Sequence, residues 1–275
     1  MTSPHDVVLS VDSITKDFRL RRGAEGRGGT TSHRAVDGVS FNLQRGEILG
    51  LAGGSGSGKT TLARCIIRLV EPDSGSVLLD GSDVLSLKGK ELRRMRRRIQ
   101  MVFQDPYSSL NPRLSIGSAI LEVGRVHSRP GADDGDQFVR EMLDRVQLSP
   151  ALALRMPREL SGGQRQRVAI ARALAAGPDV LIADEAVSAL DVSVQAQLLN
   201  LFSNLRDELG LSIIFVAHQL AVLASIADRV AVMSAGELVE LGTTKDVFQS
   251  PQHDYTKALL DAHPRADPTQ RIDPR

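Results

Sequence analysis

Short, continuous apolar runs are the clearest pattern in this chain of 275 residues. Residues 47–52, 180–183 and 211–217 each hold such a run, which is typical of a parallel strand covered on both faces. Residues 61–67 and 192–207 follow two of these runs and have helical spacing of apolar positions. Strands that alternate with helices in this way predict an α/β fold with a doubly wound, mostly parallel sheet.

Other segments predict two additions to that core. Residues 7–18, 39–43 and 76–79 have the pattern of strands in a partly antiparallel sheet. Residues 105 to about 160 are expected to be mainly helical, with helix-like apolar spacing at 116–123 and 138–146. The remaining expectations are a helix at 219–226, short strands at 229–233 and 238–242, an exposed flexible loop at 21–33, a loop at 129–136, and a solvated basic helix at 88–98.

A glycine-rich segment between the first apolar run and its helix fits the pattern G-x-x-x-x-G-K-[ST] of a phosphate-binding loop. Its glycines let successive N–H groups converge on a phosphate at the start of a helix. Lys59 is expected to reach the outer phosphates of ATP, and the Thr60 hydroxyl to bind Mg²⁺. A flexible glycine/serine linker is the alternative, but it would not lie between a strand and a helix. The expected nucleotide contacts are Gly53, Gly54, Ser55, Gly56, Ser57, Gly58, Lys59, Thr60 and Thr61.

Two carboxylates follow the apolar run at 180–183. Asp184 is expected to hold Mg²⁺, and Glu185 to polarise the attacking water. The alternative is that both acids cap a helix N-terminus, but this leaves the second carboxylate unexplained. We therefore favour a catalytic pair.

The segment Leu160–Gln164 resembles the signature of ABC transporter nucleotide-binding domains. Further motifs of that family follow the same order: Gln104 resembles its Q-loop glutamine, Ser188–Asp191 its D-loop, and His218 its switch histidine. Phe18 stands where the family places an aromatic ring under adenine. The resemblance covers residues 8–245 and implies that Gln104 lies near Mg²⁺ and that His218 supports catalysis at the γ-phosphate.

The resemblance also implies that the ATP site is completed by a second cassette. Ser161 is expected to open a helix whose free N–H groups form an anion site. In the family this helix end meets the γ-phosphate bound by the opposite subunit, so that two ATP molecules lie at a dimer interface. The expected contacts from this side are Ser161, Gly162, Gly163, Gln164 and Asp191.

Two segments resemble the peptide and nickel importer subgroup more specifically: residues 104–113 and the tail at 250–260. The tail of that subgroup usually carries His-Pro-Tyr, where this chain has Asp254 in place of proline. Other departures are Gly54 in place of Glu, Ala186-Val187 in place of Pro-Thr, and Gln219 in place of Asp. They put the rate of hydrolysis in doubt and leave the fold unaffected.

Composition bounds the function without selecting it. The net charge of +1 gives no whole-chain field for nucleic acid, and we expect none as a partner, despite the basic run at 93–98. Cys65 is the single cysteine, fits a reduced compartment and is expected to be a core residue. No signal peptide and no apolar run of about 18 residues is recognisable, so separate chains are expected to supply the membrane spans.

These features together predict an ATP-hydrolysing subunit of an importer for peptides or a related small solute. An ABC ATPase domain at 6–249, with a helical subdomain at about 105–165, would be followed by a tail at 250–275. Expected partners are integral permease subunits at the cytoplasmic face of the membrane, a second cassette with a heterodimer favoured, and indirectly an external solute-binding protein. The permease is expected to insert a short coupling helix into a groove near Gln104, with Tyr107, Leu110 and Arg113 as candidate contacts.

Three alternatives remain at this stage. A repair ATPase of the same family would carry a long coiled coil between the phosphate loop and the signature, but no heptad run fills that interval here. A translation factor would usually carry two cassettes, whereas this sequence shows one. A small-molecule P-loop kinase would have no use for the signature segment, and a cassette of an exporter or a regulatory cassette stays open. Dipeptide, oligopeptide, glutathione and nickel all remain possible solutes.

Overall fold

The computed structural model describes residues 7–20, 31–105, 109–188 and 190–262. The strands are β1 (Val7–Leu20), β2 (Thr31–Gln44), β3 (Ile48–Ala52), β4 (Ser74–Leu79), β5 (Ser82–Asp83), β6 (Ile99–Val102), β7 (Val180–Asp184), β8 (Ser212–Val216), β9 (Arg229–Ser234) and β10 (Glu237–Thr243). The helices are α1 (Lys59–Ile66), α2 (Gly89–Arg98), α4 (Ile116–Val126), α5 (Gly135–Arg145), η2 (Pro150–Leu154), η3 (Pro157–Glu159), α6 (Gly162–Leu174), α7 (Val192–Leu209), α8 (Leu220–Ile226), α9 (Thr244–Gln249) and α10 (Asp254–Asp261).

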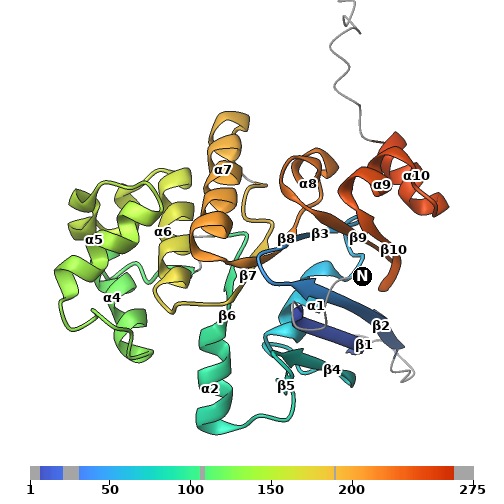
Figure 1. The fold of residues 1–275 in the computed structure, drawn as a ribbon, viewed down its shortest axis with the longest axis horizontal. Helices are drawn as coiled ribbons and strands as arrows, with labels where there is room; N and C mark the ends of the chain where they lie inside the picture. The colour runs from blue at the N-terminus through green and yellow to red at the C-terminus, as the bar shows by residue number, and fades with distance from the viewer. Residues whose placement is uncertain (1–6, 21–30, 106–108, 189, 263–275) are drawn as a thin grey trace, which may run out of the picture.

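The central sheet has the strand order β10-β9-β3-β8-β7-β6 in the described part of the chain. Its neighbours pair in parallel except for β10, which runs antiparallel to β9. A second, antiparallel sheet has the order β2-β1-β4-β5. The predicted α/β class, with a mostly parallel sheet, an antiparallel β subdomain and a helical subdomain, is confirmed. Figure 1 shows α4, α5 and α6 grouped on the side of the molecule away from β1, β2 and β4.

Strand β7 shows why its residues are apolar without alternation. Val180 and Ile182 belong to the core that includes α1 and the antiparallel sheet. Leu181 and Ala183 belong to a second core that includes α7, α8 and the helical subdomain. Because both faces of the strand are covered by protein, every one of its positions is apolar until Asp184.

Topology brings the motifs to one edge of the central sheet. The phosphate loop follows β3, His218 follows β8, the two carboxylates end and follow β7, and Gln104 follows β6. These four strands are consecutive neighbours in the sheet and run in the same direction. Open α/β sheets bind their ligands at the carboxyl ends of such strands.

The expected loop at 21–33 is too long, because β2 already begins at Thr31. Residues 31–34 pair with residues 17–20 of β1, and Phe18 lies opposite His33 in the register. Polar residues can extend this hairpin because backbone hydrogen bonds, and not burial, hold the ribbon together. Arg34 adds ion pairs to Asp17 and Asp37, both at 3.1 Å. Residues 21–30 of the expected loop lie outside the described part of the chain.

Within the described residues, no helix combines the length and the hydropathy that a membrane span requires.

Candidate nucleotide site

The phosphate loop runs from the end of β3 to the start of α1. Gly58, with φ of 100°, is the N-cap residue of α1 and supplies no side chain to the helix end. The first-turn N–H groups of the helix therefore have no side-chain cap and can receive an anion. A Cβ on Gly58 would lie 2.1 Å from the carbonyl oxygen of Ala35, so this position tolerates only glycine.

Lys59 is buried beside this loop, with 3% of its surface exposed. Its Nζ donates to the carbonyl oxygens of Gly53 (2.9 Å) and Gly54 (2.8 Å) and to Ser57 Oγ (3.2 Å). Burial lowers the pKa of Lys59, and the nearby carboxylates of Glu185 and Asp184 oppose that shift. The loop thus holds one buried cation at the base of its anion-binding N–H groups.

Asp184 ends β7 and faces the first turn of α1. Thr60 Oγ1 donates to Asp184 Oδ1 at 3.0 Å. Burial raises the pKa of Asp184, although the hydrogen bond from Thr60 counteracts the shift. A buried carboxylate beside a hydroxyl supplies the hard oxygen ligands that Mg²⁺ prefers, and a divalent cation would remove the penalty of burying the negative charge.

Glu185 is the next residue and is held in an uncommon backbone conformation, with φ of 50°. Its N–H donates to the carbonyl oxygen of Val216 on β8 (3.0 Å), and its own carbonyl accepts from the Ser188 hydroxyl (3.0 Å). Its carboxylate oxygen contacts His218 Nε2 directly, and the contact is an ion pair when the imidazole is protonated. Left-handed conformations of non-glycine residues persist where the surroundings enforce them, and they cluster at functional sites.

One cavity of about 480 Å³ brings most of the predicted residues together. It is lined by Phe18, Ser55, Gly56, Ser57, Gly58, Lys59, Thr60, Thr61, Gln104, Glu185 and His218, together with His33 and Ala35. Gln104 also lies 3.5 Å, Nε2 to Oγ, from Ser188. The last two lining residues, His33 and Ala35, were not predicted. The only signal for His33 is its register opposite Phe18, which requires knowing the hairpin.

The signature residues lie apart from that cavity's lining in the described chain. Ser161 is the N-cap of α6, and it forms a reciprocal capping box with Gln164: Ser161 Oγ accepts from Gln164 N (3.2 Å), and Gln164 Oε1 accepts from Ser161 N (3.0 Å). The predicted helix start is confirmed. The box leaves the N–H groups of Gly162 and Gly163 outside it, so they remain open to an anion.

The D-loop and the departures from the family pattern also have clear places. Asp191 caps α7, and its carboxylate accepts from Val194 N at 2.9 Å; Ala189 lies outside the described residues. Ala186 and Val187 are buried core residues. Gln219 Oε1 accepts a hydrogen bond from Gln195 at 3.5 Å. None of these residues is among those that line the cavity.

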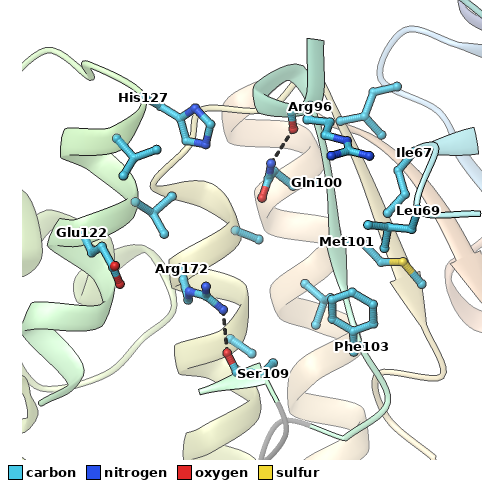
Figure 2. Close-up of a pocket in the computed structure, with 16 residues that line it drawn as sticks. Ile67, Leu69, Arg96, Gln100, Met101, Phe103, Ser109, Glu122, His127 and Arg172 are labelled. Carbon is cyan, nitrogen blue, oxygen red and sulfur yellow. Dashed lines mark hydrogen bonds between the residues drawn. The ribbon is translucent and has the colours of Figure 1, made fainter. Parts of the chain in front are cut away.

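A second cavity, of about 400 Å³, lies between the α/β core and the helical subdomain. Figure 2 shows Met101 and Phe103 on one side of it and Glu122 and His127 on the other. At its base Arg172 donates to the carbonyl oxygen of Ser109 at 2.6 Å. One of its lining residues, Phe103, directly precedes Gln104 in the chain.

The three candidate contacts with a permease segment near Gln104 differ in how the structure places them. Leu110 is buried in the core, with 3% of its surface exposed, because it packs with the helical subdomain; the expectation that it contacts a partner is wrong. Arg113 is exposed, and Tyr107 lies outside the described residues.

The tail packs against the last strand of the central sheet, with α9 and α10 beside β10 (Figure 1). Asp254 is the first residue of α10 and pairs with Lys257 at 2.9 Å. Proline and acidic residues are both favoured in the first turn of a helix, so aspartate can replace the usual proline here.

Comparison with known proteins identifies relatives over nearly the whole chain. Residues 36–188 match the ABC transporter family, and residues 239–275 match the C-terminal region of oligopeptide/dipeptide transporters. A glutathione import ATP-binding protein from Pectobacterium atrosepticum is 48% identical over 96% of this chain, and a probable peptide ABC transporter ATP-binding protein from Sinorhizobium fredii is 49% identical over 96%. The chain spans 42% of the length of the first relative and 75% of the second.

Solved structures agree with these matches. The cbiO1 component of an ABC transporter complex from Clostridium perfringens superposes with a TM-score of 0.75 at 29% identity, covering 89% of this chain and 92% of its own. A dimeric ATP-binding cassette in a post-hydrolysis state, bound to ADP and Pi, gives a TM-score of 0.73 at 29% identity, covering 86% and 98%.

Proposed function

This chain belongs to the ABC transporter family, and from that premise we propose that it is the ATP-hydrolysing subunit of an importer for peptides or a related small solute. The observation that carries the proposal is the single cavity in which the phosphate loop, Gln104, Glu185 and His218 meet. The C-terminal match to oligopeptide/dipeptide transporters and the import proteins among the relatives support the importer class. A repair or translation ATPase has no comparable support.

In this proposal, residues 53–61 hold the phosphates of ATP, and Lys59 supplies the buried positive charge. The Phe18 ring lies against adenine at the other end of the cavity. Thr60 and Asp184, with Gln104 nearby, would hold Mg²⁺, which would neutralise charge on the outer phosphates. Oxygen donors from a hydroxyl, a carboxylate and an amide fit that ion.

Catalysis then depends on Glu185 and His218. The Glu185 carboxylate accepts a hydrogen bond from the attacking water and orients it. Its contact with His218 Nε2, together with its fixed backbone, holds the carboxylate in one place before water arrives. His218, 40% exposed, remains accessible to the γ-phosphate and supports the developing charge.

We propose that the site is completed by a second cassette. The N–H groups of Gly162 and Gly163, together with Ser161, Gln164 and Asp191, lie outside the lining of the ATP cavity and would act on the nucleotide held by the opposite subunit. ATP then favours the closed pair because it contacts both cassettes only in that state. We favour a heterodimer of two different cassettes. Within this chain we assign residues 6–249 to the ABC ATPase domain and residues 250–275 to the tail.

The same proposal places a permease segment in the cavity shown in Figure 2. Its walls come from the α/β core and the helical subdomain, and Phe103 precedes Gln104 directly. A segment seated there would touch the backbone that carries Gln104. This assigns the chain to the cytoplasmic face of the membrane, where it receives no contact from the solute-binding protein outside.

The decisive experiment is size-exclusion chromatography with light scattering on Glu185→Gln, with and without ATP. An ATP-dependent homodimer would mean that this chain completes its own site. A monomer that binds ATP would mean that a different cassette is required, and copurification with the permease subunits would then identify it. A protein that binds no ATP would overturn the proposal.

A further inference from the structure

The C-terminal tail reaches the phosphate loop directly. Tyr255, the second residue of α10, accepts a hydrogen bond at its Oη from the N–H of Gly54, with a distance of 2.9 Å. The two residues are 201 positions apart. A Cβ on Gly54 would lie 3.1 Å from the same oxygen, which is closer than ordinary contact, so the loop and the phenol are fitted to each other.

The N–H of Gly54, which donates to Tyr255, and the carbonyl of Gly53, which accepts from Lys59, belong to the same peptide unit. The peptide bonds of the described chain are trans, so the N–H of Gly54 and the carbonyl of Gly53 point in opposite directions. The carbonyl oxygen of Gly53 accepts from Lys59 Nζ at 2.9 Å. A phenol that fixes the N–H on one side therefore fixes the direction of the acceptor for the lysine on the other side.

Tyr255 is itself held firmly enough to act in this way. The N–H groups of Gln252 and His253, three and two residues before it, donate to the Glu240 carboxylate at 2.9 and 3.1 Å. His253 caps α10 by accepting from the N–H of Tyr255 at 3.1 Å. Glu240 lies on β10, which is paired with β9, and the Tyr255 ring packs against the central core.

The loop side of the contact is equally constrained. Gly53 has φ of 147°, and a Cβ there would lie 2.3 Å from the carbonyl oxygen of Met233 on β9. The peptide between Gly53 and Gly54 is thus confined by β9 on one side and by the phenol on the other. Without the phenol, one of its two polar groups would lack its partner, and the peptide would be freer to rotate.

We propose that Tyr255 is a positioning residue for Lys59, acting through the peptide unit between Gly53 and Gly54. It thereby gives the peptide-importer tail a direct effect on nucleotide affinity. The inference rests on the proposed function, because it presumes that Lys59 binds the phosphates of ATP. Tyr255 itself is not among the residues that line the proposed ATP cavity.

The test is a titration of the full chain with a fluorescent ATP analogue. Tyr255→Phe keeps the ring and removes only the acceptor, and we expect it to weaken binding about fivefold, the size of one lost hydrogen bond. Lys257→Ala, an exposed change on the same helix, is the matched control and should leave the affinity unchanged. Steady-state ATPase assays should show a raised KM with kcat much less affected.

A double-mutant cycle separates positioning from a structural role. Tyr255→Phe should have no further effect on affinity when Lys59 is already alanine, because its action passes through that side chain. The melting temperature without nucleotide should stay within about 2 °C of wild type, since the partly buried ring and its packing against the core are retained. Gly54→Ala, which crowds the phenol, should weaken binding in the wild type and do so less in Tyr255→Phe.

The outcomes are distinct. Unchanged affinity in Tyr255→Phe, or an equal loss in the presence and absence of Lys59, would overturn the inference while leaving the ATPase assignment intact. A wild-type chain that does not bind the analogue would overturn the proposed function, and this inference with it.

Discussion

Thr60 Oγ1 donates a hydrogen bond of 3.0 Å to Asp184 Oδ1, although the two residues are 124 positions apart in the chain. The bond joins the first turn of α1 to the end of β7, so it connects the phosphate loop to the two carboxylates that we propose for metal binding and catalysis. Glu185 directly follows Asp184 in the chain, and its carboxylate contacts His218. A displacement of the phosphate loop would therefore also shift the Asp184 and Glu185 carboxylates. Four predictions test this arrangement and its surroundings.

Glu185→Gln should retain ATP binding and lose turnover by about 100-fold or more, the range expected for a lost general base. Glutamine keeps the size of the side chain and can still accept a hydrogen bond from His218, but it is a much weaker base. Steady-state phosphate release and analogue titration would measure the two effects. Glu208→Gln, an exposed change on α7, is the control, and normal turnover in Glu185→Gln would refute the assignment of Glu185.

Asp184→Asn should raise the melting temperature at pH 7 in the absence of Mg²⁺, while abolishing Mg²⁺-dependent hydrolysis. Burial raises the pKa of Asp184 above its ordinary value of 3.8. The ionised carboxylate therefore destabilises the folded chain at pH values above its folded pKa, and this cost disappears below 3.8, where both states are protonated.

The increase in melting temperature caused by Asp184→Asn should accordingly become smaller as the pH is lowered from 7 towards 4. Thermal melts at several pH values would measure it, with the exposed Asp133→Asn as the baseline. A variant that is less stable than wild type at pH 7 would contradict the expected sign.

Gly163→Ala should destabilise the chain by about 1–3 kcal/mol, because overpacking a close contact outweighs the better helix propensity of alanine. A Cβ there would lie 2.6 Å from Val194 Cγ1 at the start of α7. Adding Val194→Ala should restore much of the loss. Gly162→Ala is the matched control, since its Cβ would meet Leu190 at an ordinary 3.6 Å. Chemical denaturation of the monomer would measure these effects, and equal costs at both glycines would count against the packing explanation.

Cys65 should resist thiol reagents at pH 7–8 in the native chain. Its side chain is fully buried on α1, and that burial raises the pKa of the thiol to about 11. Labelling with iodoacetamide, followed by intact mass, should give one adduct in denaturant and almost none without it. Rapid labelling of the folded chain would place Cys65 outside the core.

The sequence predicts the core and the motifs well because each depends on local patterns. The run at 180–183 is apolar on every residue because both faces of β7 are buried, and the order of motifs follows from the order of strands. What could not be predicted depends on tertiary register. His33 enters the cavity only because a polar ribbon continues β2 past its apolar part, and Leu110 turns inward despite lying in a segment with a proposed surface role. The bond between Gly54 and Tyr255 joins segments that no periodicity relates.

Strand β7 is shared by two hydrophobic cores, with Val180 and Ile182 in one and Leu181 and Ala183 in the other. Neither core can open without exposing half of the strand. The amides of residues 181–183 should consequently exchange with deuterium only when the whole domain unfolds, whereas those at helix ends exchange by local fraying. Local opening therefore does not displace Asp184 and Glu185 from the end of the strand: as long as the chain is folded, the proposed metal ligand and the proposed base keep their places.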